Sequence, residues 1–200
     1  MANRALIVID VQESFRTHPL WSTVSNPDIV DDVNRLVNHA REQADLVVWC
    51  LHTEPGTGGV FDPEQGQVEY QPGLRAPLPT EPQLRKTSIN AFTTTNLQQL
   101  LTERGIRELA VCGIRTEQCC ETTARIAADL GYDVTFVVDA TATHPIPHRD
   151  APAGRTPEEI LADPRTLPVE AVIERTVFAL AGRFATIATV DEVVGLPVGG

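Results

Sequence analysis

The sequence lacks the features that mark secreted and membrane proteins. Its four cysteines stand at uneven intervals along 200 residues, too few and too scattered for a secreted disulfide framework. The apolar runs at 6–9 and 136–138 are far shorter than the roughly 20 residues of a membrane-spanning helix. The amino terminus enters a strand-like stretch without a signal-peptide pattern. We therefore expect a reduced cytoplasmic protein.

Positive charge is also scarce. Sixteen Lys and Arg residues stand against 27 Asp and Glu, a net charge of −11, and the basic residues form no cluster. Such a chain repels phosphate backbones and anionic lipids, which argues against nucleic acid or membrane partners and leaves a small-molecule substrate. A hydrophobic content of 42% with 22% charged residues is typical of globular proteins. The length predicts a single domain over 1–200.

Short β-branched runs alternate with amphipathic segments along the chain. The runs predict strands at 4–10, 46–51, 109–112, 133–139 and 184–189. Apolar residues at helical spacing predict helices that open at 26–27, near 95, near 117 and near 168. Thr95 with Gln98, and Thr189 with Glu192, have capping-box spacing. The alternation predicts a three-layer α/β/α sandwich around a mostly parallel, doubly wound sheet.

Two proline-rich loops interrupt this pattern. Residues 53–82 hold six prolines and five glycines, and 145–164 is also proline-rich. Loops of this length are usually functional or disordered, so we expect them to form pocket walls. The aromatic residues Phe15, Trp21, Phe61 and Tyr70 are candidates to contact substrate there, or to fill gaps between helices and sheet.

Polar residues follow two buried strands, at the edge where ligands bind in parallel sheets. Asp10 ends the first run, and the segment 113–120 follows the third. Cys119 falls in the first turn of a predicted helix, where the helix dipole lowers a thiol pKa and free N–H groups bind an oxyanion. Asp10 is a candidate base and Lys86 a candidate cation. Each residue also has an ordinary structural role: a buried thiol, a turn carboxylate, a surface lysine.

Three segments together resemble a known family. They are VIDVQESF (8–15), KTSINAFTTTNL (86–97) and VCGIRTEQC (111–119). In this order and spacing they are similar to the signatures of the isochorismatase-like cysteine hydrolases, a resemblance that extends over nearly the whole chain.

The resemblance implies a catalytic triad of Asp10, Lys86 and Cys119. It also implies an oxyanion hole made by the backbone N–H groups of Arg115 and Cys119, with a cis peptide bond between Ile114 and Arg115. The implied reaction cleaves a small non-peptide amide through a thioester, without a cofactor. Family members are homo-oligomers, so we expect a dimer or tetramer.

The remaining cysteines have simpler interpretations. Cys120 shares a stripe with Ala124 and Ala127 and is expected in the core, while Cys50 and Cys112 lie inside predicted strands. A vicinal disulfide between Cys119 and Cys120 is a strained alternative.

Departures from the family pattern narrow the range of expected substrates. Nicotinamidases of the family hold a metal with an Asp/His/His set, whereas this chain offers only His52 with Glu54 in that region, so we expect no metal. Two alternatives stay open: a vinyl-ether hydrolase that uses Asp10 as an acid, and a non-catalytic ligand-binding protein. Candidate substrate contacts are Gln12, Phe15, Trp21, His52, Ile114 and His144, whereas His148 is expected to be a loop residue.

Overall fold

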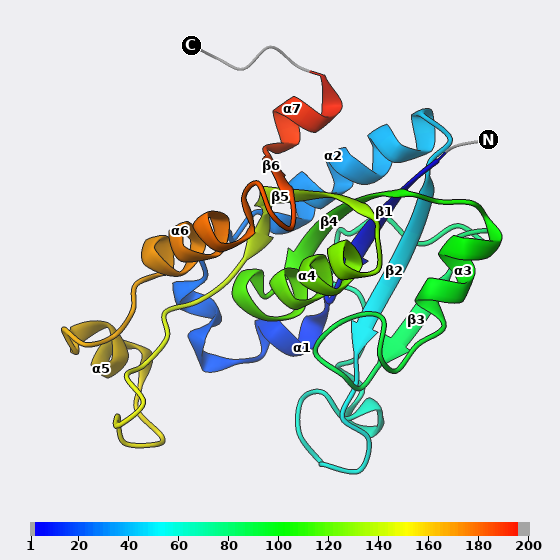
Figure 1. Cartoon of the computed structure of the whole chain (residues 1–200). Coiled ribbons are helices and arrows are strands. Elements are labelled where there is room, and N and C mark those ends of the chain that lie inside the picture. The colour runs from blue at the N-terminus through cyan, green and yellow to red at the C-terminus, as the bar shows by residue number, and fades with distance from the viewer. Residues whose placement is uncertain (1–2, 196–200) are drawn as a thin grey trace.

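The computed structural model describes residues 3–195 and contains a six-stranded sheet in the order β3-β2-β1-β4-β5-β6. Its strands are β1 (Arg4–Ile9), β2 (Leu46–His52), β3 (Gln83–Lys86), β4 (Glu108–Ile114), β5 (Asp133–Ala142) and β6 (Thr186–Ala188). Every pair of neighbouring strands is parallel. The predicted doubly wound sheet is therefore confirmed (Figure 1).

Helices cover both faces of the sheet. One face packs against α2 (Ile29–Glu42) and α7 (Val190–Val194). The other packs against α3 (Leu97–Glu103), α4 (Glu121–Asp129) and α6 (Val169–Leu180). Separate apolar clusters fill the two interfaces. The three-layer α/β/α architecture follows, because a strand run that is apolar on both sides must be covered on both sides.

The chain reverses its direction of travel across the sheet between β1 and β4. It first builds outward from β1 to β2 and β3, and then returns to place β4 on the other side of β1. Parallel strands leave a crevice at this switch point, beyond their carboxyl ends. Residues that follow β1 and β4 are thereby brought to the same place.

The long helices form where the apolar spacing predicts them. In α2 the residues Ile29, Val33, Leu36, Val37 and Ala40 are buried along one stripe. Gly131 follows α4 with φ +88, the left-handed conformation that ends helices. Thr189 and Glu192 form the expected capping box of α7.

Some local expectations are wrong. The helix expected over 117–130 is present, but its first turn, η3 (Thr116–Cys120), is π-helical and α4 follows it directly. Residue Asn96 rather than Thr95 precedes α3, and no side chain caps it. The hydroxyl of Thr95 accepts from the N–H of Leu97 instead, which is local turn geometry.

Short helices occur in segments for which no helix was predicted. They are α1 (Glu13–Arg16), η1 (Pro19–Thr23), η2 (Pro63–Gln65) and α5 (Pro157–Ala162). Thr156 and Glu159 form a capping box around α5, with Pro157 in its first turn. The capping-box spacing is present in the sequence, but the prolines around it are typical of an irregular loop.

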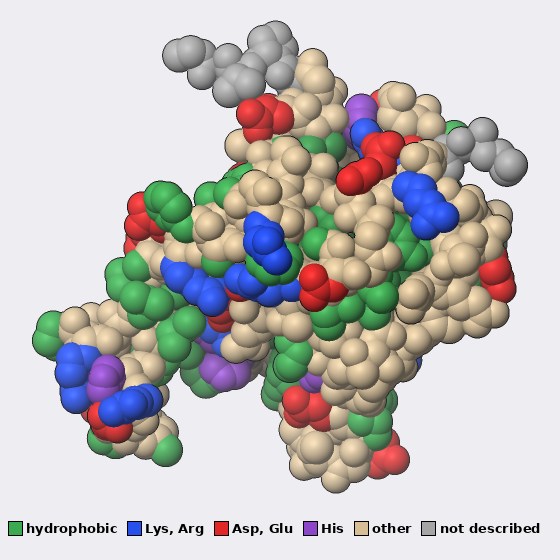
Figure 2. Space-filling view, viewed as in Figure 1, with side chains coloured by type: hydrophobic (Ala, Val, Ile, Leu, Met, Phe, Trp, Pro, Cys, Tyr) green, Lys and Arg blue, Asp and Glu red, His purple; other side chains and the backbone are tan. Residues whose placement is uncertain are grey.

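Two segments project from the carboxyl edge of the sheet. They are the loop that follows β2 and the segment that holds α5 (Figure 1). Figure 2 shows them as separate protrusions, with histidine side chains between and beside them. Among residues 3–195, no helix combines the length and apolar content needed to cross a membrane.

Candidate active site

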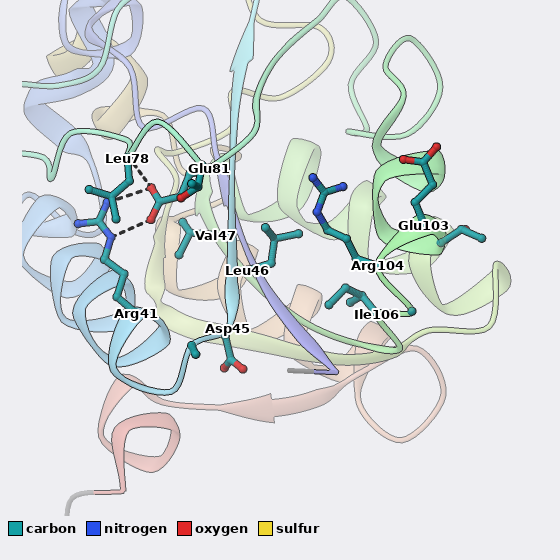
Figure 3. Close-up of a pocket in the computed structure, with 13 residues that line it drawn as sticks. Arg41, Asp45, Leu46, Val47, Leu78, Glu81, Glu103, Arg104 and Ile106 are labelled. Atoms are coloured by element: carbon teal, nitrogen blue, oxygen red, sulfur yellow. Dashed lines mark hydrogen bonds and ion pairs between the residues drawn. The ribbon is translucent and has the colours of Figure 1, made fainter. Parts of the chain in front are cut away.

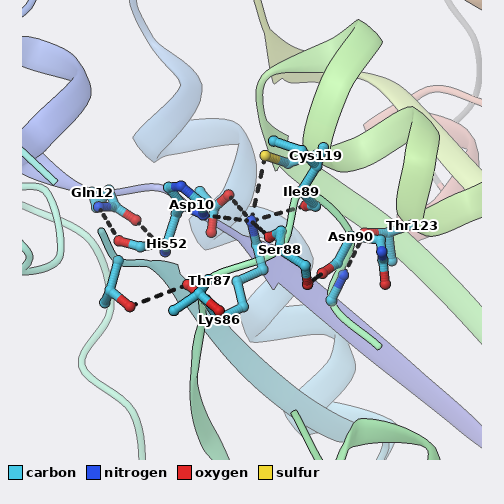
Figure 4. A network of polar contacts seen from close by, with 12 residues as sticks. Asp10, Gln12, His52, Lys86, Thr87, Ser88, Ile89, Asn90, Cys119 and Thr123 are labelled. Atoms are coloured by element: carbon cyan, nitrogen blue, oxygen red, sulfur yellow. Dashed lines mark hydrogen bonds and ion pairs between the residues drawn. The ribbon is translucent and has the colours of Figure 1, made fainter. Parts of the chain in front are cut away.

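Three polar side chains from different strands meet at the switch point. Asp10 follows β1, Lys86 ends β3, and Cys119 lies in η3 after β4. The Nζ atom of Lys86 lies 2.8 Å from Oδ2 of Asp10 and 3.4 Å from Sγ of Cys119. Figure 4 shows the lysine lying between the other two residues, which we call the Asp10–Lys86–Cys119 cluster.

The backbone turns sharply at Asp10 to aim its carboxylate. Asp10 has φ 53, in the left-handed region that Asp tolerates better than most residues. Its N–H donates to the carbonyl of Cys50 at 2.9 Å, and its own carbonyl accepts from Gln12 at 2.8 Å. The turn therefore begins as an extension of the sheet and then departs from it.

Gly113 permits the close contact between β1 and β4. It has φ +125, and a Cβ at this position would lie 1.9 Å from the carbonyl oxygen of Ile9. The register between β4 and β5 shifts at the same point, between Val111 and Gly113. Such a bulge redirects the chain that follows it. The strand nevertheless continues to Ile114, beyond the predicted end at Cys112.

The cluster is almost completely enclosed by protein. Asp10 and Lys86 are 0% exposed and Cys119 is 5% exposed. Burial raises the pKa of Asp10, and the Lys86 ammonium opposes that rise. Burial alone lowers the pKa of Lys86, but the charges of Asp10 and Cys119 outweigh it, so that the pKa of Lys86 is raised. The lysine therefore stays an ammonium beside a carboxyl that is more basic than usual.

The thiol of Cys119 differs from expectation. Burial, followed by the nearby charge of Asp10, raises the pKa of Cys119 to about 12, although Lys86 opposes the rise. The expected lowering by a helix dipole is wrong, because Cys119 lies in a buried π-helical turn before α4 begins. A thiol of this kind needs a base in contact with it to become a nucleophile.

The turn before Cys119 is held by its own backbone. The peptide bond between Ile114 and Arg115 is cis, as expected. The carbonyl of Arg115 accepts from the N–H groups of Gln118 and Cys120, each at 3.2 Å. The N–H groups of Arg115 and Cys119 remain the predicted oxyanion donors.

Gln12 lies close to the cluster and is fully buried. Its side-chain oxygen accepts from the N–H of His52 at 2.7 Å, and its amide donates to the His52 carbonyl at 3.1 Å and to Ser14 Oγ. Gln12 thus ties β2 to the segment after β1. Ile114 packs in the α2-side core. Neither side chain presents a free polar group to a ligand.

The expected aromatic contacts are dispersed. Phe15 meets the edge of Phe61, with ring centroids 5.0 Å apart. Trp21 packs against the α2-side core, and the ring of Tyr70 packs against Trp49. Phe15 and Phe61 therefore meet at the loop after β2, whereas Trp21 and Tyr70 occupy packing positions.

His144 belongs to a second polar group that the sequence pattern did not indicate. Its ring is stacked on His18, with centroids 5.5 Å apart. Burial, together with the charge of Arg115, lowers the pKa of His144 to about 3. Arg115 Nη2 lies 2.8 Å from Oε1 of Glu117, and the other carboxylate oxygen, Oε2, accepts from Thr143 Oγ1. The sequence signal that could have indicated the Arg115–Glu117 ion pair is the presence of two opposite charges in a turn after a buried strand.

The other cysteines lie in the core. Cys50, Cys112 and Cys120 are at most 1% exposed, and burial raises the pKa of each. All four thiols are free, so the described structure does not contain the alternative vicinal disulfide. His148 lies in the loop after β5 and contacts Asp150, away from the cluster.

A separate cavity of about 950 Å³ lies at the opposite edge of the sheet. Leu46 and Val47, at the start of β2, line it together with Ile106. Arg41 and Glu81 join through two hydrogen bonds along its wall (Figure 3). The Glu81 carboxylate is also held by Trp49 Nε1, so this group is part of the framework.

The sequence matches a known family over most of its length. A model of the isochorismatase domain matches residues 4–156. The chain belongs to the isochorismatase family. The resemblance seen in the three sequence segments is thereby confirmed.

Relatives within the isochorismatase family share both sequence and fold with this chain. Streptothricin hydrolase from Streptomyces noursei is 39% identical over 152 residues, which cover 72% of this chain and 56% of that enzyme. Nicotinamidase 3 from Arabidopsis thaliana is 33% identical, covering 70% of this chain and 73% of that protein. A solved isochorismatase structure from Pseudomonas putida has a TM-score of 0.80 at 30% identity, covering 95% and 89% of the two chains. The chain thus spans little more than half of streptothricin hydrolase.

The residues present do not fit the metal set of the family's nicotinamidases. Both ring nitrogens of His52 have neighbours, since Nδ1 lies 3.4 Å from Lys86 Nζ and Nε2 lies 3.3 Å from Glu54 Oε1. Within residues 3–195 no group of three or more His, Cys, Asp or Glu side chains is placed to hold a metal ion. An ammonium beside His52 also repels a cation.

Proposed function

We propose that this isochorismatase-family protein hydrolyses a small non-peptide amide, with Cys119 as the nucleophile. The observation that carries the proposal is the contact of the Lys86 ammonium with both Asp10 and Cys119 in a buried crevice. A thiol, a carboxylate that can take its proton and a cation that can stabilise the thiolate together suit covalent catalysis by cysteine. The names of two relatives, a streptothricin hydrolase and a nicotinamidase, agree with hydrolysis of a C–N bond.

The first step forms a thioester. Asp10 accepts the Cys119 proton as sulfur attacks the substrate carbonyl, and the Lys86 ammonium stabilises the thiolate that develops. The carbonyl electron pair moves to oxygen, where the N–H groups of Arg115 and Cys119 stabilise it. Asp10 then gives its proton to the leaving nitrogen as the C–N bond breaks.

The second step releases the acid. Asp10 takes a proton from a water molecule that attacks the thioester carbonyl. The C–S bond breaks, and the proton returns to the sulfur of Cys119. The raised pKa of Asp10 supports its use in both directions, because a carboxylate that is more basic than usual takes up a proton more readily and can then donate it to the leaving nitrogen.

The test is ammonia or amine release from a panel of small amides and carbamoyl compounds, with pyruvate release measured for isochorismate. We expect Cys119→Ala to lose activity by at least about 10³-fold. The matched control is Cys120→Ala, which removes the neighbouring core thiol and should keep most of the activity. Full activity of Cys119→Ala on an amide would exclude the proposed nucleophile.

One observation favours a second candidate function. Burial raises the pKa of Asp10, and a protonated Asp10 is suited to protonate a vinyl ether, the reaction of an isochorismatase. This chemistry needs no thiol, so turnover of isochorismate would survive Cys119→Ala and fail in Asp10→Asn. If no panel member is turned over and iodoacetamide labels Cys119 no faster than a model thiol, the ligand-binding alternative is favoured.

A further inference from the structure

The Lys86 ammonium has more neighbouring acceptors than protons. An ammonium carries three N–H bonds. Its Nζ lies within hydrogen-bond distance of five acceptors: Asp10 Oδ2 at 2.8 Å, the carbonyls of Ile89 at 2.9 Å and Ser88 at 3.2 Å, Cys119 Sγ at 3.4 Å and His52 Nδ1 at 3.4 Å. Its position is therefore set by competition among these acceptors. Among the three side chains in this set, only His52 has no role in the proposed reaction.

The lysine also fixes the tautomer of His52. An ammonium only donates, so the Nδ1 atom that faces it must carry the lone pair, and the ring proton must be on Nε2. That nitrogen lies 3.3 Å from Oε1 of Glu54. A continuous chain of donors and acceptors thus runs from Lys86 through His52 to a carboxylate whose side chain is 47% exposed.

The imidazole is held from several sides. His52 is the last residue of β2 and pairs in register with Lys86 of β3. The side chain of Gln12 accepts from the backbone N–H of His52 at 2.7 Å and donates to its backbone carbonyl at 3.1 Å, which fixes the backbone from which the ring projects. The ring meets Phe61 at 71° with centroids 5.5 Å apart, and the residue is 8% exposed. A ring fixed in this way offers an acceptor at a constant place.

We propose that His52, oriented by Glu54, is a positioning residue that holds the Lys86 ammonium between Asp10 and Cys119. A neutral acceptor serves this purpose better than a second carboxylate, because it restrains the ammonium without cancelling its field at the sulfur. The Glu54 carboxylate polarises the Nε2–H bond and makes Nδ1 a stronger acceptor. This inference rests on the proposed function, since the position of the ammonium matters only if Cys119 becomes a thiolate.

Two substitutions separate positioning from packing. His52→Asn places an amide oxygen close to the position of Nδ1 and keeps an acceptor for Lys86. His52→Phe keeps an aromatic ring against Phe61 and removes the acceptor. On the amide that the wild type turns over fastest in the panel, we expect kcat of His52→Phe to fall about 10²-fold. KM should change little, and His52→Asn should recover most of kcat.

A spectroscopic measurement needs no turnover. Lys86 is the single lysine in the chain, so protein made with ¹³Cε-lysine gives one Cε signal. We expect His52→Phe to shift or broaden that signal and His52→Asn to leave it close to the wild type. Melting temperatures of both variants confirm that they are folded.

The outcomes are separable. An unchanged lysine signal in folded His52→Phe, or equal loss of kcat in the Asn and Phe variants, would overturn the positioning role. Full activity of Cys119→Ala in the same assay would instead overturn the proposed function, and the lysine signal would still report on the contact between His52 and Lys86.

Discussion

The protonation states of Asp10 and Lys86 control the chemistry proposed for this site. Both groups are enclosed by protein, and each is the nearest countercharge of the other. An isolated buried charge is costly, whereas a hydrogen-bonded pair keeps both charges in place. Enclosure therefore both sets the pKa values and excludes the water that would screen the pair.

We expect a broad pH profile for kcat/KM. Turnover needs ionised Asp10 and protonated Lys86. Burial raises the pKa of Asp10 above 3.8, so activity should fall as the pH drops through this raised value, at a higher pH than for an ordinary aspartate. The pKa of Lys86 is raised above 10.5, so no loss is expected below that pH. A profile that falls between pH 8 and pH 10 would contradict the assignment.

Gly113 is the residue whose replacement should be most damaging to the backbone. A Cβ would overlap the carbonyl of Ile9 at 1.9 Å, and φ is +125. We expect Gly113→Ala to lower the free energy of unfolding by about 4 kcal/mol or more. Gly131→Ala is the matched control, because φ is also positive but nothing lies within 4 Å, so its cost should be about 1 kcal/mol. Urea denaturation measures both.

Among the structural elements, η3 decides where the nucleophile lies. A regular helix that began after Gly113 would rotate Cys119 by about 100° for each residue inserted or removed. The bulge in β4 and the π-helical turn add length before α4 begins. Cys119 thereby faces Lys86 while Cys120 faces the core beside Ala124.

A capping substitution tests the stability of α7, the short helix that follows β6. Thr189 accepts from the N–H of Glu192, and Val190 of the same short helix is fully buried. Thr189→Ala should lower the free energy of unfolding by about 1 kcal/mol. Thr189→Ser keeps the hydroxyl and should cost much less. Equal losses in chemical denaturation would mean that the cap does not stabilise α7.

At the scale of the whole molecule, the two apolar layers hold the strands that carry the site. Asp10 and Lys86 stand at the ends of strands separated by β2, so their contact depends on sheet packing rather than on local chain geometry. The dimer or tetramer expected from the family resemblance stays a prediction, which analytical ultracentrifugation would measure.

Core packing should dominate global stability. Phe136 of β5 is 0% exposed, whereas Phe178 of α6 is 77% exposed. We expect Phe136→Ala to lower the free energy of unfolding by about 3–5 kcal/mol. Phe178→Ala removes the same ring from the surface and should change stability by less than about 0.5 kcal/mol. A large loss in the second variant would indicate that the monomeric structure is not the folded unit.

The parallel sheet, five of its six strands and the identity of the clustered residues were predictable from the sequence, whereas β3, which carries Lys86, was not among the predicted strands. Short apolar β-branched runs are typical of strands buried on both faces, and the carboxyl ends of parallel strands lie at one edge. The segments around Asp10, Lys86 and Cys119 also carried the family resemblance. These features depend on residue type and spacing, which the sequence contains in full.

Tertiary structure alone decided the protonation states and the neighbours of the cluster. The pKa of Cys119 is raised because chain segments distant in sequence enclose it and bring the charge of Asp10 beside it. His52 contacts Lys86 because neighbouring strands pair in register, across 34 positions in the sequence. Burial and register arise from the packing of the whole chain, and for that reason no local pattern predicted them.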